Sequence, residues 1–192
     1  MKLHHRCELV LPGWLDDFIG AWQEPLDTTE QRMRLAVALA DENVRHHTGG
    51  PFGAIVVEQL GGRLLGVGVN LVTNLELSLA HAEMVAVSLA QSAAGNWNLG
   101  ESAKTQLVTS CEPCAMCFGA VPWSGVNSII WGALREDAEA AGFDEGDKPR
   151  DWIDSLHRRG IETQGGVLRE EAVAVFEHYA GKDGAIYHPE RS

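Results

Sequence analysis

The residues best suited to chemistry are a histidine, a glutamate and two cysteines, which occur in two short runs. His81-Ala82-Glu83 forms the first run, and Pro113-Cys114-Ala115-Met116-Cys117 forms the second. Cysteines three positions apart share one face of a helix, so both can reach one metal ion, and the positive N-terminal end of a helix favours ionised sulfur. With His81 as the third ligand, Zn²⁺ keeps one tetrahedral position open, as catalytic zinc sites do. We therefore predict one zinc ion per chain.

A further thiol lies close to the second run in the sequence. Cys111 is three residues before Cys114, and a fourth protein ligand would close the site and make it structural. We expect Glu112-Pro113 to hold Cys111 outside the helix that carries the two ligand cysteines. A site closed by Cys111 is the alternative that the sequence leaves open.

Glu83 indicates what an open zinc site would do. It lies two residues from His81, so at helical spacing it is not a second ligand but can face the open metal position. A carboxylate there can take a proton from a zinc-activated water and then protonate a ring nitrogen or a leaving amine. The pairing of His-x-Glu with Pro-Cys-x-x-Cys is typical of enzymes that hydrolytically deaminate nucleobases. The alternative from another class is a zinc-stabilised interaction module without catalysis, in which a carboxylate beside the metal has no use.

Composition limits the partners of such a site. The chain has 192 residues and 45% hydrophobic content, enough for one domain with a buried core. Its formal charge of −12 opposes binding to a phosphate backbone, so we expect a small-molecule substrate and no nucleic-acid partner. Three of its four cysteines are crowded within residues 111–117, which suits a metal site in the reducing cytosol. Residues 1–17 contain no long apolar run, so we expect neither a signal peptide nor a membrane anchor.

The elements that must position these residues follow from periodicity and turn signals. Thr28 and Gln31 form a capping-box pattern before apolar residues at helical spacing, and Gly61-Gly62 separates two β-rich runs as in a hairpin. Pro113 is typical of a helix's first turn. We predict helices over residues 29–47, 81–93, 113–121, 149–159 and 169–179, and strands over residues 54–60, 63–70, 105–109 and 128–132.

Over about residues 30–146 the chain resembles the cytidine deaminase superfamily, and within it the small guanine deaminases. The likeness includes the two zinc motifs, the run Pro51-Phe52-Gly53-Ala54-Ile55-Val56, and Asn70 eleven residues before His81. The runs Thr109 to Cys114 and Ala140 to Glu145, with Trp123, point to guanine. The resemblance implies an α/β fold, a three-layer α/β/α sandwich with a mixed five-stranded sheet. It makes residues 1–192 one catalytic domain, with about residues 149–192 as a C-terminal helical extension.

The resemblance also implies roles for individual residues. Asn70 would hydrogen-bond the purine edge, and Glu145 would be a second proton shuttle beside Glu83. The substrate-binding candidates are Asn70, Phe52, Ala82, Trp123, Asp144 and Tyr187. Phe52 and Trp123 would help wall the pocket, and Tyr187 would belong to a C-terminal lid over this site or that of a partner subunit.

The reaction implied is conversion of guanine to xanthine and ammonia, with related aminotriazines such as ammeline as further substrates. A homodimer is implied as well, for which the terminal helices offer the apolar side chains of Trp152, Ile153, Leu156, Val173 and Phe176. The runner-up enzyme is a tRNA adenosine deaminase, which shares the fold and both zinc motifs but needs a basic surface that a charge of −12 does not favour.

The acidic run after Gly142 leaves one question of register. An extra carboxylate at Asp144 or Glu145 could accept a hydrogen bond from the N1–H or amine of guanine and help ammonia to leave. Spacing alone does not choose between the two residues. Without the family resemblance, a solvated acidic loop is the simpler interpretation of this run.

Overall fold

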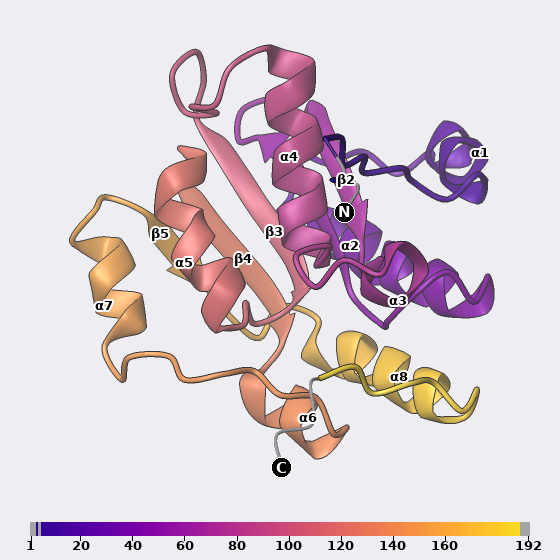
Figure 1. Cartoon of the computed structure of the whole chain (residues 1–192). Helices are drawn as coiled ribbons and strands as arrows, with labels where there is room; N and C mark the ends of the chain where they lie inside the picture. Colours follow the sequence, from indigo (N-terminus) through magenta and orange to yellow (C-terminus); the bar gives the residue numbers. More distant parts are fainter. Residues whose placement is uncertain (1–2, 4, 189–192) are drawn as a thin grey trace.

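The computed structural model describes residue 3 and residues 5–188 (Figure 1). Eight helices and five strands occur in this part of the chain. In order they are α1 (Trp14–Ala21), α2 (Thr29–Arg45), β1 (Gly53–Glu58), β2 (Leu64–Val69), α3 (Val72–Leu75), α4 (Ala82–Ala94), β3 (Thr105–Cys111), α5 (Ala115–Ser124), β4 (Ser128–Ala133), α6 (Arg135–Ala140), α7 (Trp152–His157), β5 (Glu162–Gln164) and α8 (Arg169–Ala180).

The five strands form one mixed sheet in the order β2-β1-β3-β4-β5. The β1–β2 hairpin is antiparallel, as its two-glycine turn predicts, and both glycines have positive φ. Strand β3 runs antiparallel to β1 but parallel to β4, and β4 runs parallel to β5. The parallel half is connected through helices on the face of the sheet, as parallel strands require. The predicted mixed five-stranded sheet is confirmed.

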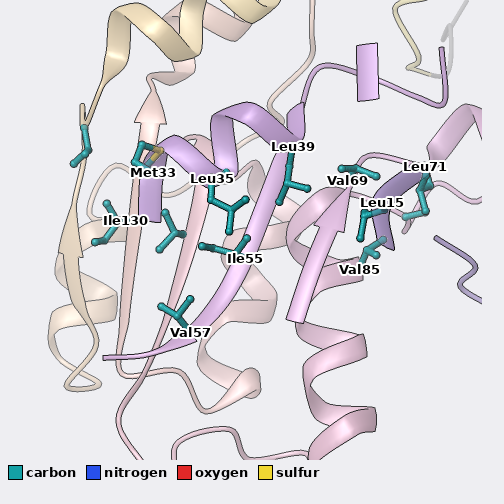
Figure 2. Packing of buried hydrophobic residues seen from close by; sticks show 14 residues of the cluster. Leu15, Met33, Leu35, Leu39, Ile55, Val57, Val69, Leu71, Val85 and Ile130 are labelled. Atoms are coloured by element: carbon teal, nitrogen blue, oxygen red, sulfur yellow. The ribbon is translucent and has the colours of Figure 1, made fainter. Parts of the chain in front are cut away.

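Helices cover both faces of this sheet, which gives the three layers. Side chains of a strand alternate between faces, so Ile55 and Val57 pack on one side of β1 while Ala54 and Val56 pack on the other. On the first side Leu35 and Leu39 of α2 lie against Ile55, as Figure 2 shows. On the second side the small residues of α4 and the apolar residues of α5 and α7 complete a separate cluster.

The ends of α2, α4 and α8 lie within two residues of those expected, whereas α5 and α7 need correction; α7 spans Trp152–His157 and not residues 149–159. The Thr28–Gln31 capping box is present at α2, whose expected range is right within two residues. Helix α5, in contrast, is capped by Cys114 and begins at Ala115, so Pro113 precedes the helix and is not in its first turn. The helix also continues past Pro122 to Ser124, whereas the sequence analysis ended it at Val121. None of the described helices is long and apolar enough to cross a bilayer.

The terminal helices pack on the rest of the fold, which corrects a second expectation. Trp152 and Leu156 of α7 are buried in the α4-side cluster, and Phe176 of α8 is buried against α2 and the sheet end. Ile153 and Val173 are partly buried against the same clusters. These apolar side chains are therefore occupied within the chain and are not the free surface that the sequence analysis assigned to a dimer.

One edge of the sheet gathers the segments that carry the chemical motifs. Strands β3 and β4 end there, β1 begins there, and β2 ends there just before Asn70. The N-termini of α4 and α5 face the same edge: α5 follows the loop after β3, and α4 follows β2 and the short helix α3. Gly68 lets α4 lie close, since a Cβ at this position would be 2.1 Å from the carbonyl oxygen of Ala82. The first turn of α4 is thus seated directly on β2.

Candidate active site

The three predicted metal ligands converge at two helix N-termini. His81 caps α4, Cys114 caps α5, and Cys117 follows in the first turn of α5. The Nδ1 atom of His81 lies 3.5 Å from the Cys114 sulfur and 3.7 Å from the Cys117 sulfur. All three donor atoms lie within 4.8 Å of one another. This triad of His81, Cys114 and Cys117 is the spatial cluster that the motif spacing predicts.

The dimensions of the triad fit zinc. Zinc bonds of about 2.3 Å to sulfur and about 2.1 Å to nitrogen give a tetrahedron with edges of about 3.6 Å. The two nitrogen–sulfur separations, 3.5 and 3.7 Å, match that edge. A hydrogen bond from the Cys117 thiol, helped by His81, lowers the pKa of Cys114 to about 4, so one thiolate is already available to a cation.

Cys111 stands apart from the triad. It is the last residue of β3 and is buried, and its sulfur lies 4.0 Å from the carbonyl oxygen of Leu134. Among the described residues, the side chains that lie close enough together to hold one metal ion are His81, Cys114 and Cys117, and Cys111 is not one of them. The Glu112-Pro113 segment separates Cys111 from α5, as we expected from the sequence.

Two carboxyl groups are buried beside the triad. Glu83, in the first turn of α4, is 8% exposed, and burial followed by the negative charge of Cys114 raises its pKa to about 7. Glu145, in the loop after α6, is 5% exposed, and burial raises its pKa to about 8. The pKa values of both carboxyl groups are therefore close to neutral pH, as residues that take up and release protons need.

Burial distinguishes the two acidic residues of the loop. The Oε2 atom of Glu145 is buried and has no hydrogen-bond partner among residues 5–188, so it is available to a ligand. Its backbone carbonyl accepts a hydrogen bond of 2.9 Å from the N–H of Ala115, which ties the loop to α5. Asp144 is exposed, and its Oδ1 accepts from the N–H of Gly146 at 2.8 Å. Of the two candidates, Glu145 is the buried acid.

These groups line one cavity of about 200 Å³ at the edge of the sheet. Asn70 contributes a buried carboxamide. Phe52 forms part of the wall, and its ring meets that of Phe143 edge to face with the ring centres 4.9 Å apart. Tyr187 packs on Phe143 with the ring centres 5.6 Å apart and brings the C-terminal segment over the cavity. The residues lining the cavity are Phe52, Asn70, Val72, Ser78, His81, Glu83, Cys111, Glu112, Cys114, Phe143, Asp144, Glu145, Tyr187 and His188.

Comparison with known proteins identifies the family of this site. Residues 26–133 match the family model described as the cytidine and deoxycytidylate deaminase zinc-binding region. The chain belongs to this family. The matched range contains both motifs and all three residues of the triad.

Two guanine deaminases are among the relatives of this deaminase. It is 40% identical over 116 residues to the guanine deaminase of Bacillus subtilis, covering 60% of this chain and 71% of the relative. The solved guanine deaminase of Nitrosomonas europaea is similar with a TM-score of 0.87 and 38% identity, over 94% of this chain and 100% of that chain. A solved structure in complex with 2,6-diaminopurine is similar with a TM-score of 0.87 and 40% identity, over 94% of this chain and 96% of that chain.

Two of the expected substrate-binding residues do not line the cavity of the deaminase. Trp123 lies near the end of α5, is 79% exposed and is not among the residues that line the cavity. The side chain of Ala82 is buried in the core between α4 and the sheet. The pocket wall that Trp123 was expected to form is supplied instead by Phe143 and Tyr187.

Lys148 supports the site although the sequence motifs do not indicate it. Its side chain is only 2% exposed, forms an ion pair with Glu112 and donates to the Pro113 carbonyl oxygen at 2.8 Å. Its ammonium group also lies 4.6 Å from the ring centre of Trp152. Lys148 thus joins the loop of Glu145 to the turn that precedes Cys114. A lone lysine in an acidic run was the available signal, but its buried partners are distant in sequence.

Proposed function

We propose that this deaminase hydrolyses guanine to xanthine and ammonia at the cavity between α4, α5 and the Glu145 loop. The observation that carries the proposal is the meeting of Asn70, Glu83 and Glu145 in one small cavity beside the triad. A structural zinc module needs none of these three groups, since burying polar and ionisable side chains costs stability. Their arrangement suits a heterocycle that presents several donors and acceptors on its edge.

Glu83 is the residue proposed to move protons during the addition of water. Zinc held by His81, Cys114 and Cys117 supplies a Lewis acid that lowers the pKa of a water molecule. Glu83 takes the proton from the water that adds to C2 of guanine and passes it to the ring nitrogen next to C2. A pKa of about 7 lets the same carboxyl act first as base and then as acid.

Glu145 and Asn70 are proposed to hold the base and complete the reaction. Glu145 binds the N1–H and amine edge through the oxygen that lacks a partner, and it helps to protonate the departing ammonia. Asn70 presents a carboxamide that can donate to and accept from the purine edge. The sum of the steps is one water consumed and one ammonia released, with both carboxyl groups returned to their starting protonation.

The relatives support guanine as the substrate. The curated relative from Bacillus subtilis and the solved structure from Nitrosomonas europaea are both guanine deaminases. A related structure binds 2,6-diaminopurine, a purine with an amino group at C2 as in guanine. A cavity of about 200 Å³, partly covered by Tyr187, suits a free base better than a nucleoside or a tRNA loop.

One screen tests this assignment. Ammonia release is measured on zinc-loaded protein with guanine, ammeline, adenine, cytosine, cytidine and guanosine, and with tRNA as the macromolecular alternative. We expect the highest kcat/KM on guanine and no turnover of guanosine. Turnover of adenosine in tRNA without turnover of guanine would replace the proposal by its runner-up. Zinc content measured on the same preparation ensures that a negative result is not a loss of metal.

The setting in which the enzyme works is also proposed. We infer one catalytic domain that includes residues 134–188, because α8 packs on both α2 and β4 and the chain returns over the cavity. Four free cysteines support a reducing compartment, and we place the enzyme in the cytoplasm. The exposed Trp123 of α5 offers apolar surface to a second copy, so we propose a homodimer. Sedimentation at micromolar concentration checks the dimer, and a monomer would contradict it.

A further inference from the structure

A fully buried carboxamide lies directly behind the cavity. Asn43, on α2, is 0% exposed and does not line the cavity itself. Its Nδ2 donates to the carbonyl oxygens of Gly50 and Asn70, each at 2.9 Å. Both hydrogens of one side-chain amide are therefore used to join two segments that reach the cavity.

The orientation of this amide is imposed by neighbouring donors. The Thr48 hydroxyl donates to Asn43 Oδ1 at 2.6 Å, while the same hydroxyl accepts from the indole N–H of Trp14 at 3.1 Å. Since Oδ1 faces a donor, Nδ2 must face the two carbonyl oxygens, and a flipped amide would place like groups together. A chain of hydrogen bonds thus runs from α1 through Thr48 and Asn43 to the backbone at Asn70.

Both joined segments contribute directly to the cavity. The side chain of Asn70 lines it, and its Oδ1 also accepts from the N–H of Val72 at 3.3 Å, so its direction depends on the backbone at this point. Gly50 lies under Tyr187, where a Cβ would be only 2.4 Å from the tyrosine oxygen. Gly49 is equally close to the other segment, since its Cβ would be 1.8 Å from the carbonyl oxygen of Asn70.

Strand pairing alone does not hold this region. The N–H of Asn70 donates to Phe52 at 3.0 Å just beyond the last paired residues of β1 and β2. Beyond that bond, the carbonyl oxygen of Asn70 is bonded by Asn43 from the layer of α2. The buried amide therefore takes the place of the sheet ladder where the sheet opens into the cavity.

We propose that Asn43 is a positioning residue for substrate binding, which acts through Asn70 and through the Gly50 turn beneath Tyr187. It does not touch the base. It sets the direction of the Asn70 carboxamide and the position of Tyr187 over the Gly50 turn. Its loss therefore weakens binding of the purine edge while leaving the triad and Glu83 intact. This inference rests on the proposed function, because the assay substrate is guanine.

The test replaces the Asn43 amide by a carboxylate of the same shape, which accepts hydrogen bonds where the amide NH₂ donates them. Asn43→Asp keeps an acceptor for Thr48 but turns the two amide hydrogens into an oxygen that faces two carbonyl oxygens. We expect KM for guanine to rise about tenfold with kcat little changed, the pattern of lost uniform binding. In an Asn70→Ala background, Asn43→Asp should raise KM much less, because the residue through which it acts is absent. Equal effects in both backgrounds would overturn the proposal.

Two further variants separate positioning from general stability. Gln106→Glu makes the same amide-to-acid change at a buried site near the start of β3, where Gln106 bonds Arg32 and Ser128. It should leave KM unchanged even where the melting temperature moves. If Asn43→Asp fails to fold, Thr48→Val removes the hydroxyl that orients Asn43, and a smaller rise in KM is expected. An unchanged KM in Thr48→Val would then count against the proposal.

A structural measurement makes the result independent of turnover. A crystal structure of zinc-loaded Asn43→Asp should show the Asn70 side chain redirected relative to Glu83, with the metal ligands unmoved. An unmoved Asn70 overturns the positioning role even if the enzyme proves inactive on guanine. Absence of ammonia release from the unaltered protein, in contrast, overturns the proposed function alone.

Discussion

Two carboxyl groups face the same cavity from different elements, and their surroundings suit them to the different roles that we propose. Glu83 belongs to the first turn of α4 and touches the triad, so its charge responds to the metal ligands. Glu145 belongs to a loop and has a buried oxygen to which no described residue donates, so this oxygen can accept from a ligand. Their pKa values, about 7 and about 8, place both near the range where a proton can be taken up and released.

Glu83→Gln tests the proton transfer. The amide keeps the size of the side chain but cannot accept the proton of water, so kcat on guanine should fall by about 10²–10⁴. Zinc content should be unchanged, because the metal ligands are His81, Cys114 and Cys117 in the proposal. Steady-state ammonia assays and metal analysis check both statements. A variant that lost zinc together with activity would instead point to Glu83 as a ligand.

Glu145→Gln and Asp144→Asn form a matched pair that tests the second acid. Each replaces one carboxylate by its amide, but only Glu145 is buried with an oxygen free for the substrate. We expect Glu145→Gln to lower kcat/KM on guanine by about tenfold or more, and Asp144→Asn to leave it nearly unchanged. The opposite result would assign the role to Asp144 despite its exposed position.

The sequence predicts a site residue well when chemistry and spacing act together. His81, Glu83, Cys114 and Cys117 are drawn from two local motifs, each on one helix start, and the structure brings the four together. Trp123 is different, because only its type and its closeness to Cys117 in sequence suggested a pocket wall. Which face of a helix end a side chain occupies depends on packing from distant segments, and spacing does not report it.

At the scale of elements, the contact between α4 and β2 determines where the first motif lies. Gly68 has no side chain between the strand and the carbonyl oxygen of Ala82, and Gly66 gives the same clearance one turn along. A larger residue in β2 would lift the helix start that carries His81 and Glu83. The strand therefore controls the position of the metal site although it contributes no ligand.

Gly68→Ala tests this control. Its new Cβ meets backbone that cannot rotate away, so we expect the free energy of unfolding to fall by about 1–3 kcal/mol and zinc affinity to weaken. Gly119→Ala is the control, since Gly119 is in α5 and, apart from the backbone of its own helix, no atom of the described residues lies within 4 Å of a new Cβ. It should be neutral or stabilise by up to about 1 kcal/mol. Denaturant unfolding and zinc titration of both variants provide the comparison.

The longest periodic elements were predicted, whereas α1, α3, α6 and β5 were not; α7, with six residues, was predicted over residues 149–159. Helices α2 and α4 and the hairpin have caps, turns and apolar periods in their own residues, so local physics specifies them. Strand β5 has only three residues and is a strand because β4 pairs with it. Helices α3 and α6 have four and six residues, too few for a helical period to appear in the sequence.

At the scale of the whole molecule, the C-terminal segment returns over a cavity built from the middle of the chain. Helix α8 packs on α2 and β4, and the segment after it places Tyr187 against Phe143 and above Gly50. Tyr179 of α8 secures this path by donating from its hydroxyl to the carbonyl oxygen of Ala185 at 2.7 Å. Family resemblance suggests such a lid; in the described chain Tyr187 lines the same cavity as Glu83 and Glu145, and we propose that the segment acts as a lid there.

Truncation after Gly184 tests whether this covering serves binding or stability. Removing the segment takes away Tyr187 and opens the cavity to water, so kcat/KM on guanine should fall by about tenfold or more, mostly through KM. The melting temperature should change little, because the α8 contacts with α2 and β4 remain. Tyr187→Phe is the companion variant that keeps the ring and removes only the buried hydroxyl, which has no partner within the described chain. If the hydroxyl binds substrate, Tyr187→Phe shares most of the KM effect; if the ring only excludes water, the variant stays close to the unaltered enzyme. A truncated enzyme with full activity would show that the cavity needs no cover from its own chain.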